Sequence, residues 1–261
     1  MRYETHELGV GGILDQAIAV TKDHFWLLFK IVIVMLLPFT IVAGWLIAED
    51  VLAAQAGQGL SMRFGILSLV NMAVVYPLTN AAMIYAVASS YLSRPVSVAT
   101  AFRRAVSVFL PLLWTMFLLW LVLTAGMILL IVPFFIFLLW YALIVQVVVL
   151  EGLSGRAALK RSHQLMKGNA GTAIVLGILV LVISWALNFM QSVIPVGVLR
   201  LIVYSVIQSL LFIFGAAAWV VFYFSCRAKA EHFDLALLAD AVGVEDDQPP
   251  DALNVSPGEV R

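Results

Sequence analysis

An uninterrupted uncharged stretch from Ala105 to Leu150 constrains this chain more than any other feature of its sequence. Almost every residue in the stretch is apolar, and none is Asp, Glu, Lys or Arg. As one helix it would be about 69 Å long, whereas the hydrocarbon core of a bilayer is about 30 Å thick. The stretch is too long to cross a membrane once and suited to cross it twice. It therefore predicts an integral membrane protein.

The composition supports that prediction. Hydrophobic residues make up 63% of the chain and charged residues 11%, whereas a soluble domain carries about 25% charged residues. The formal net charge is +0, which predicts no nucleic-acid partner. The apolar runs are continuous blocks rather than the short alternating segments of a barrel, and a helix satisfies its own backbone in lipid. We therefore predict an all-α, polytopic helical membrane protein.

The hydrophobic blocks predict six transmembrane helices and a polar tail. The predicted spans cover residues 25–48, 64–92, 106–132, 133–150, 170–194 and 198–226. Pro77 predicts a kink in the second span, and Pro133 predicts the break between the third and fourth. Residues 1–243 form the predicted helical membrane domain. Residues 244–261, with adjacent prolines and no apolar periodicity, are expected to be a disordered acidic cytoplasmic tail.

The distribution of Lys and Arg predicts the orientation of the spans. One side holds most of these residues: Arg2, Lys22, Arg94, Arg103, Arg104, Arg156, Lys160, Arg161, Lys167, Arg227 and Lys229. The opposite side holds only Arg63 and Arg200. Basic residues stay in the cytoplasm, so both termini of this multi-pass protein are expected there. An even number of spans agrees with this.

A short amphipathic stretch precedes each odd-numbered span. The apolar faces have helical spacing and are, in chain order, Ile13, Leu14, Ala17 and Ile18; Val98, Phe102, Ala105, Val106 and Phe109; and Ala158, Leu159, Ser162, Leu165 and Met166. We interpret the chain as three units, each an interfacial helix followed by a two-span hairpin. Basic residues on such helices anchor them to anionic headgroups. The expected lipid-headgroup contacts are Arg103, Arg104, Lys160 and Arg161.

The predicted membrane interior contains amides but no central ionisable group. The amides are Asn71, Asn80, Asn188, Gln146, Gln191 and Gln208. Intramembrane amides tie helices together by hydrogen bonds, or they line a path for a polar solute, and both interpretations stay open. Glu151 is the only acid at the end of a span, and we expect it to pair with Arg156 or Lys160.

Chemistry-bearing motifs are missing from the sequence. The four His residues have no metal-ligand spacing, and there is no nucleophile elbow or phosphate-binding glycine loop. We therefore expect no enzyme activity, no metal and no cofactor. The single cysteine, Cys226, excludes an internal disulfide and is expected to be a packing residue.

Two segments resemble a known family. Residues 151–162, EGLSGRAALKRS, followed by Leu165-Met166-Lys167-Gly168-Asn169, are similar to its "E-x-x-S … A-L-K-R-S … L … K-G-x" signature. Residues 222–235, FYFSCRAKAEHFDL, resemble its closing "Y-x-x-x-R-x-x-x-E-x-F-D-L". The family comprises bacterial membrane proteins named after the membrane domain of glycerophosphoryl diester phosphodiesterase. The resemblance implies a multi-pass protein of the bacterial inner membrane with six spans and cytoplasmic termini, and we expect the catalytic domain to be absent.

Two functions follow as hypotheses. The first is a non-enzymatic integral membrane protein that acts as a scaffold or accessory and associates with anionic phospholipids. The alternative is a transporter or channel for an uncharged or amphiphilic solute, with the six amides lining its route.

Overall fold

The computed structural model describes residues 8–36, 38–39, 42, 62–129, 131–192 and 198–231, and these residues form helices without any strand. The elements, in chain order, are α1 (Val10–Asp23), an apolar helix Phe25–Leu36, α3 (Met62–Val70), the π-helical turn η1 (Asn71–Val75), α4 (Tyr76–Tyr91), α5 (Val98–Leu129), α6 (Ile131–Trp140), α7 (Ile144–Gln146), the π-helical turn η2 (Val147–Glu151), α8 (Gly155–Met166), α9 (Ala170–Ser192) and α10 (Val198–Glu231). The all-α prediction is confirmed.

Five helical segments within the described ranges are long and apolar enough to cross a membrane, which indicates a multi-pass membrane protein. They are Gly65–Tyr91, Val98–Ile128, Val132–Glu151, Ala170–Met190 and Ser205–Glu231. Each overlaps one of the predicted spans two to six. Of the predicted first span, the apolar helix Phe25–Leu36 is described, and most of the remainder lies outside the described residues. Six spans therefore stay a prediction.

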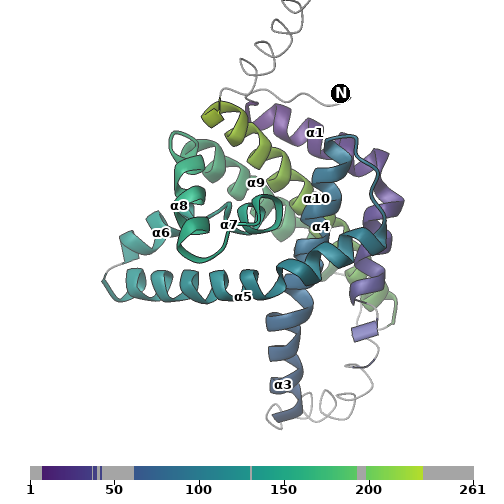
Figure 1. The fold of residues 1–261 in the computed structure, drawn as a ribbon. Helices are drawn as coiled ribbons and strands as arrows, with labels where there is room; N and C mark the ends of the chain where they lie inside the picture. The colour runs from purple at the N-terminus through teal and green to yellow at the C-terminus, as the bar shows by residue number, and fades with distance from the viewer. Residues whose placement is uncertain are drawn as a thin grey trace, which may run out of the picture.

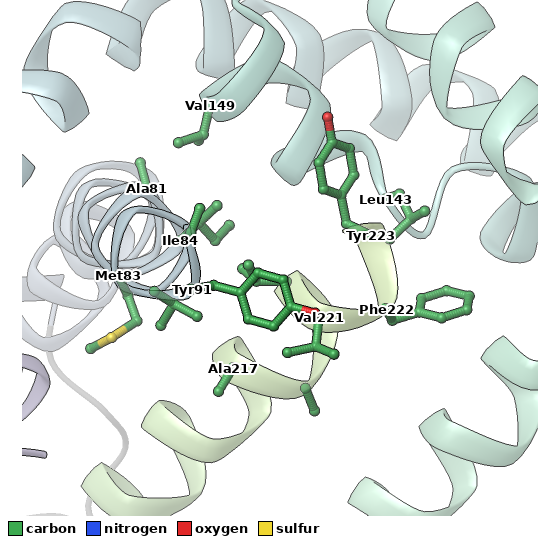
Figure 2. Packing of buried hydrophobic residues seen from close by; sticks show 14 of the residues in the cluster. Ala81, Met83, Ile84, Tyr91, Leu143, Val149, Ala217, Val221, Phe222 and Tyr223 are labelled. Carbon is green, nitrogen blue, oxygen red and sulfur yellow. The ribbon is translucent and has the colours of Figure 1, made fainter. Parts of the chain in front are cut away.

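The core lies between α4 and α10, and small residues build much of it (Figures 1 and 2). Its fully buried alanines include Ala81, Ala82, Ala86, Ala217 and Ala218. Small side chains let two helix backbones approach closely. In lipid, where burial of apolar surface does not favour association, helices associate through such close packing. Larger side chains such as Ile84, Val221 and Phe222 fill the space around them (Figure 2).

α1 closes one side of this core through polar contacts with two helices. The backbone amide of Leu8 donates to Ser225 Oγ at 2.9 Å. Tyr91 Oη donates to Gln16 Oε1 at 2.5 Å, and the ring of Tyr91 stacks on Phe224 with centroids 5.2 Å apart. The N-terminal helix is thereby fixed to both α4 and α10. Cys226 is buried beside these contacts, as its predicted packing role requires.

The stretch before the third span differs from its prediction. It continues without a break into α5, which runs crosswise to α3 and α4 (Figure 1). The buried face is Ala101, Ala105, Val108 and Leu112. Phe102 and Val106, which belong to the predicted apolar face of this stretch, are 47% and 51% exposed. The predicted apolar face is thus divided: its large side chains Phe102 and Val106 face outward, and the helix packs on the protein through small residues such as Ala105.

The break between the predicted third and fourth spans comes earlier than expected. α5 ends at Leu129 and α6 begins at Ile131, so Pro133 lies in the first turn of α6 rather than at the break. Proline fits there because the first amides of a helix have no partner within it. The fourth span is also discontinuous, since a turn at residues 141–143 separates α6 from α7. Before Pro77, the helix widens into the π-helical turn η1.

Gly126 permits the close approach of α5 and α6. A Cβ atom at this position would lie 2.8 Å from Phe137 Cδ2 and 3.3 Å from the Cα atom of Phe134. Because the second contact is backbone, a rotamer change cannot relieve it. We expect Gly126→Ala to lower the free energy of unfolding by about 1–3 kcal/mol. Thermal unfolding in detergent measures this effect.

Gly177 provides the matched control. It lies in the middle of α9, and an added Cβ would meet no heavy atom within 4 Å. Gly177→Ala should therefore leave the unfolding temperature unchanged or raise it, because alanine is the better helix former. Equal unfolding temperatures for the two variants would contradict the close contact at Gly126.

Candidate functional site

A cluster of charged side chains joins the end of η2, the middle of α8 and the end of α10. Arg161 Nε donates to Glu151 Oε2 at 2.8 Å and to Oε1 at 3.0 Å. Arg161 Nη2 also donates to Glu231 Oε1, and Arg227 Nε donates to Glu231 Oε2 at 2.7 Å. Tyr223 Oη donates to Glu151 Oε1 at 2.8 Å. We call these five residues the ionic cluster.

Local backbone geometry turns α8 toward α10. Gly152 and Gly155 have φ angles of 72° and 57°, a left-handed conformation that other residues rarely adopt, so the chain reverses between η2 and α8. The amide of Gly155 donates to Thr115 Oγ1 at 2.8 Å, which fixes the start of α8 to α5. Ser162 Oγ donates to the carbonyl of Trp140 at 3.1 Å and fixes its middle to α6. The basic side chain at position 161 therefore reaches both carboxylates.

The cluster balances its charges. Two carboxylates face two guanidinium groups, and the tyrosine hydroxyl supplies one more donor. Burial lowers the pKa of Arg161, but the hydrogen bonds and charges of Glu151 and Glu231 outweigh that effect and raise it overall. The guanidinium is thus charged at any physiological pH. Such an arrangement is suited to holding helices together rather than to acid–base chemistry, which needs a group that titrates near neutral pH.

The partner of Glu151 differs from the predicted one. We expected Arg156 or Lys160, the bases of the following loop, and both are exposed. Arg161 pairs with Glu151 instead. It lies at the edge of the buried side of α8, between buried Ser162 and exposed Lys160. Sequence reasoning also missed Tyr223, Arg227 and Glu231, although their four-residue spacing places them on one face of a helix and could have indicated a shared site.

The four basic residues predicted to contact lipid headgroups fall into two classes. Arg103 and Lys160 are exposed. Arg104 and Arg161 are partly buried and bind within the protein: Arg161 lies in the ionic cluster, and Arg104 donates from Nε and Nη2 to the carbonyl of Val149 at 3.0 and 2.6 Å. Two of the four side chains are thus engaged by protein acceptors.

The outer face of α8 carries a row of exposed bases. Arg156 and Lys160 are four residues apart on one side of the helix, and Lys167 is exposed directly after its last residue, Met166. We call these three residues the basic stripe. The opposite side, formed by Gly155, Ala158, Ser162, Leu165 and Met166, is buried. This buried set agrees with the predicted apolar face, except that Leu159 is only partly buried.

The amides predicted to line a solute path do not share one environment. Asn71 is exposed, and Asn80, Asn188 and Gln208 are half-buried. Asn188 Nδ2 donates to the carbonyl of Ser184 in its own helix at 2.7 Å. Gln146, on α7, is 6% exposed and its Oε1 atom has no hydrogen-bond partner. The side chain of Gln191 lies outside the described residues.

Comparisons with protein-family models, with curated proteins and with solved structures find no match to this chain. Across the described ranges, no group of three or more His, Cys, Asp or Glu side chains is arranged to hold a metal ion. The inference about function therefore depends on the ionic cluster and the basic stripe.

Proposed function

We propose that this chain is a non-enzymatic scaffold or accessory protein of the bacterial inner membrane, with both termini in the cytoplasm, and that it binds anionic phospholipid through the basic stripe. The observation that carries the proposal is the two-sided character of α8. One side packs on the membrane helices, the other presents Arg156 and Lys160, and Lys167 is exposed directly after the helix ends. A helix of this kind lies in the headgroup plane.

The ionic cluster supports the proposal because it sets the orientation of α8. Arg161 lies next to Lys160, and its bonds to Glu151 and Glu231 hold α8 on η2 and α10 while the side chain of Lys160 stays exposed. All five residues of the cluster belong to the two segments that resemble the membrane-domain family. Membership of that family is part of the same proposal, and anchoring of α8 is the role we assign to those residues.

The proposal predicts a loss of anionic-lipid affinity when the stripe is neutralised. Each base near an anionic surface contributes about 1 kcal/mol, which is about fivefold in affinity. We expect Lys160→Gln to weaken phosphatidylglycerol binding by about that factor, and Arg156→Gln/Lys160→Gln to weaken it further. Native mass spectrometry of the full chain, titrated with phosphatidylglycerol against phosphatidylcholine, measures the change.

Arg63→Gln is the matched control, because Arg63 is equally exposed but belongs to the side of the membrane predicted to face outward. This variant should retain the phosphatidylglycerol affinity of the unmodified chain. Unchanged affinity in both stripe variants, or an equal loss in the Arg63 variant, would overturn a specific role for α8. Phosphatidylcholine binding should be the same in all of them.

The alternative, a transporter or channel for an uncharged or amphiphilic solute, has one observation in its favour. Gln146 is buried with an unpartnered acceptor, which a passing solute could use. The other described amides are exposed or half-buried, so they do not extend a buried polar path from Gln146. Lipid association is therefore the function that the arrangement of side chains supports best.

A further inference from the structure

We propose that the acidic C-terminal tail of this chain binds the basic stripe of α8 and excludes anionic lipid from it. The residues that would make the contact are Glu245, Asp246, Asp247 and Asp251. The competition with lipid rests on the proposed function, whereas docking of the tail on α8 does not.

The ionic cluster determines where the tail begins. α10 ends at Glu231, whose carboxylate accepts hydrogen bonds from Arg227 on α10 and from Arg161 on α8. Residue 232 therefore follows directly from a side chain in contact with α8. Lys160 is the next residue to Arg161, so the tail starts beside the stripe.

The length of the tail suits the distance to be covered. Glu245 follows Glu231 by about 14 residues, which span about 20 Å as a flexible coil and about 21 Å as a helix. α8 has 12 residues and is about 18 Å long, with Arg161 near its middle. Either conformation allows the acidic group to reach every base of the stripe.

Charge makes the stripe the natural partner of the tail. After Glu231 the chain contains the acids Asp234, Asp240, Glu245, Asp246, Asp247, Asp251 and Glu259, and a single base, Arg261. The stripe is exposed, and no acid of α8 lies among its bases, since the helix contains none. Tethering gives the tail a local concentration in the millimolar range, so weak ion pairs suffice for binding. Arg161 and Arg227 are already paired and do not compete for the tail.

Tail and lipid cannot occupy the same bases together. Anionic headgroups and the tail carboxylates both neutralise Lys160 and Lys167, and each repels the other. The tail would therefore be displaced where anionic lipid is abundant and would cover the stripe where it is scarce. Added salt should weaken both contacts, because these exposed charges are screened within about 8 Å at physiological ionic strength.

Carbodiimide cross-linking of the full chain in neutral detergent tests docking without any lipid. The reagent joins an amine and a carboxylate that are in contact, and peptide mass spectrometry locates the bond. We expect links from Lys160 or Lys167 to residues 245–251. Lys22, exposed on α1, is the internal control and should react with the tail much less. Absence of the α8 links, or equal linking to Lys22, would overturn docking.

A tail variant tests the competition. In Glu245→Gln/Asp246→Asn/Asp247→Asn we expect the α8 links to disappear and phosphatidylglycerol affinity to rise about threefold or more. The charge-preserving variant Glu245→Asp/Asp246→Glu/Asp247→Glu should behave like the unmodified chain. Unchanged affinity in the neutral variant would overturn the competition. Cross-links between the tail and α8 without any stripe-dependent lipid binding would overturn the proposed function and support docking. Stripe-dependent lipid binding without these cross-links would overturn docking alone.

Discussion

Replacement of Arg161 by glutamine is expected to lower the free energy of unfolding by about 2–3 kcal/mol. The substitution leaves Glu151, whose side chain is 13% exposed, with the hydroxyl of Tyr223 as its remaining partner among the cluster residues. Breaking a fully buried ion pair costs about 3–5 kcal/mol, because the charge left behind is uncompensated. The 22% exposure of Arg161 indicates partial access to water, which reduces that cost.

A double-mutant cycle isolates the pair. Glu151→Gln should be less harmful than Arg161→Gln, since Arg161 retains Glu231 as a partner. The double variant should be more stable than the sum of the single losses predicts, with a coupling energy of about 1–2 kcal/mol. Thermal unfolding in detergent followed by circular dichroism provides the measurement.

The neighbouring residue supplies the control for this prediction. Lys160 differs from Arg161 by one position on the same helix, but its side chain is exposed. Lys160→Gln should keep the unfolding temperature of the unmodified chain. If Arg161→Gln unfolds at that same temperature, the ionic cluster does not stabilise the packing of α8 on α10.

The hydrophobic blocks of the sequence predict the helices well, because backbone satisfaction in lipid leaves a long apolar segment few alternatives to a helix. The predicted spans two to six each overlap a helix of sufficient length, and the buried side of α8 matches its predicted residues except for Leu159. In these cases the signal is local, since it comes from residues within a few turns of one another.

The side of a lipid-facing helix that packs inward is harder to predict. Periodicity of hydrophobic residues identifies the inner face only where the outer face meets water. The start of α5 has apolar residues on more than one side, so Phe102 and Val106 do not identify its buried side, which Ala101 and Ala105 form. Spacing of small residues is the better guide, as the buried pair Ala82 and Ala86 in α4 shows.

The ionic cluster could be predicted only in part, because two of its contacts join residues about 70 positions apart in the sequence. The need of Glu151 for a basic partner follows from its place at the end of an apolar segment. The identity of that partner depends on the reversal at Gly152 and Gly155, and sequence distance alone favours the nearer Arg156. Likewise, the sequence predicts the same lipid contact for the adjacent Arg103 and Arg104, although their surroundings in the structure differ.

That difference leads to opposite expectations for two adjacent arginines. Arg104 donates two hydrogen bonds to the carbonyl of Val149, which lies within the last turn before the helix ends at Glu151, where helix carbonyls lack partners of their own. Hydrogen bonds from a charged donor contribute about 1.5–3 kcal/mol, so Arg104→Gln should lower the free energy of unfolding by about 2 kcal/mol. Arg103 is exposed, and Arg103→Gln should leave the unfolding temperature unchanged.

Lipid affinity should show the reverse order. Arg103 is free to meet an anionic headgroup, so Arg103→Gln should weaken phosphatidylglycerol binding by about fivefold. Arg104→Gln should weaken it less, because the guanidinium is held by Val149. Arg104→Lys retains the charge but cannot form the forked pair of bonds, and should recover only part of the lost stability. Equal stabilities for the Arg103 and Arg104 glutamine variants, measured by thermal unfolding, would show that the Val149 contact does not hold η2 on α5.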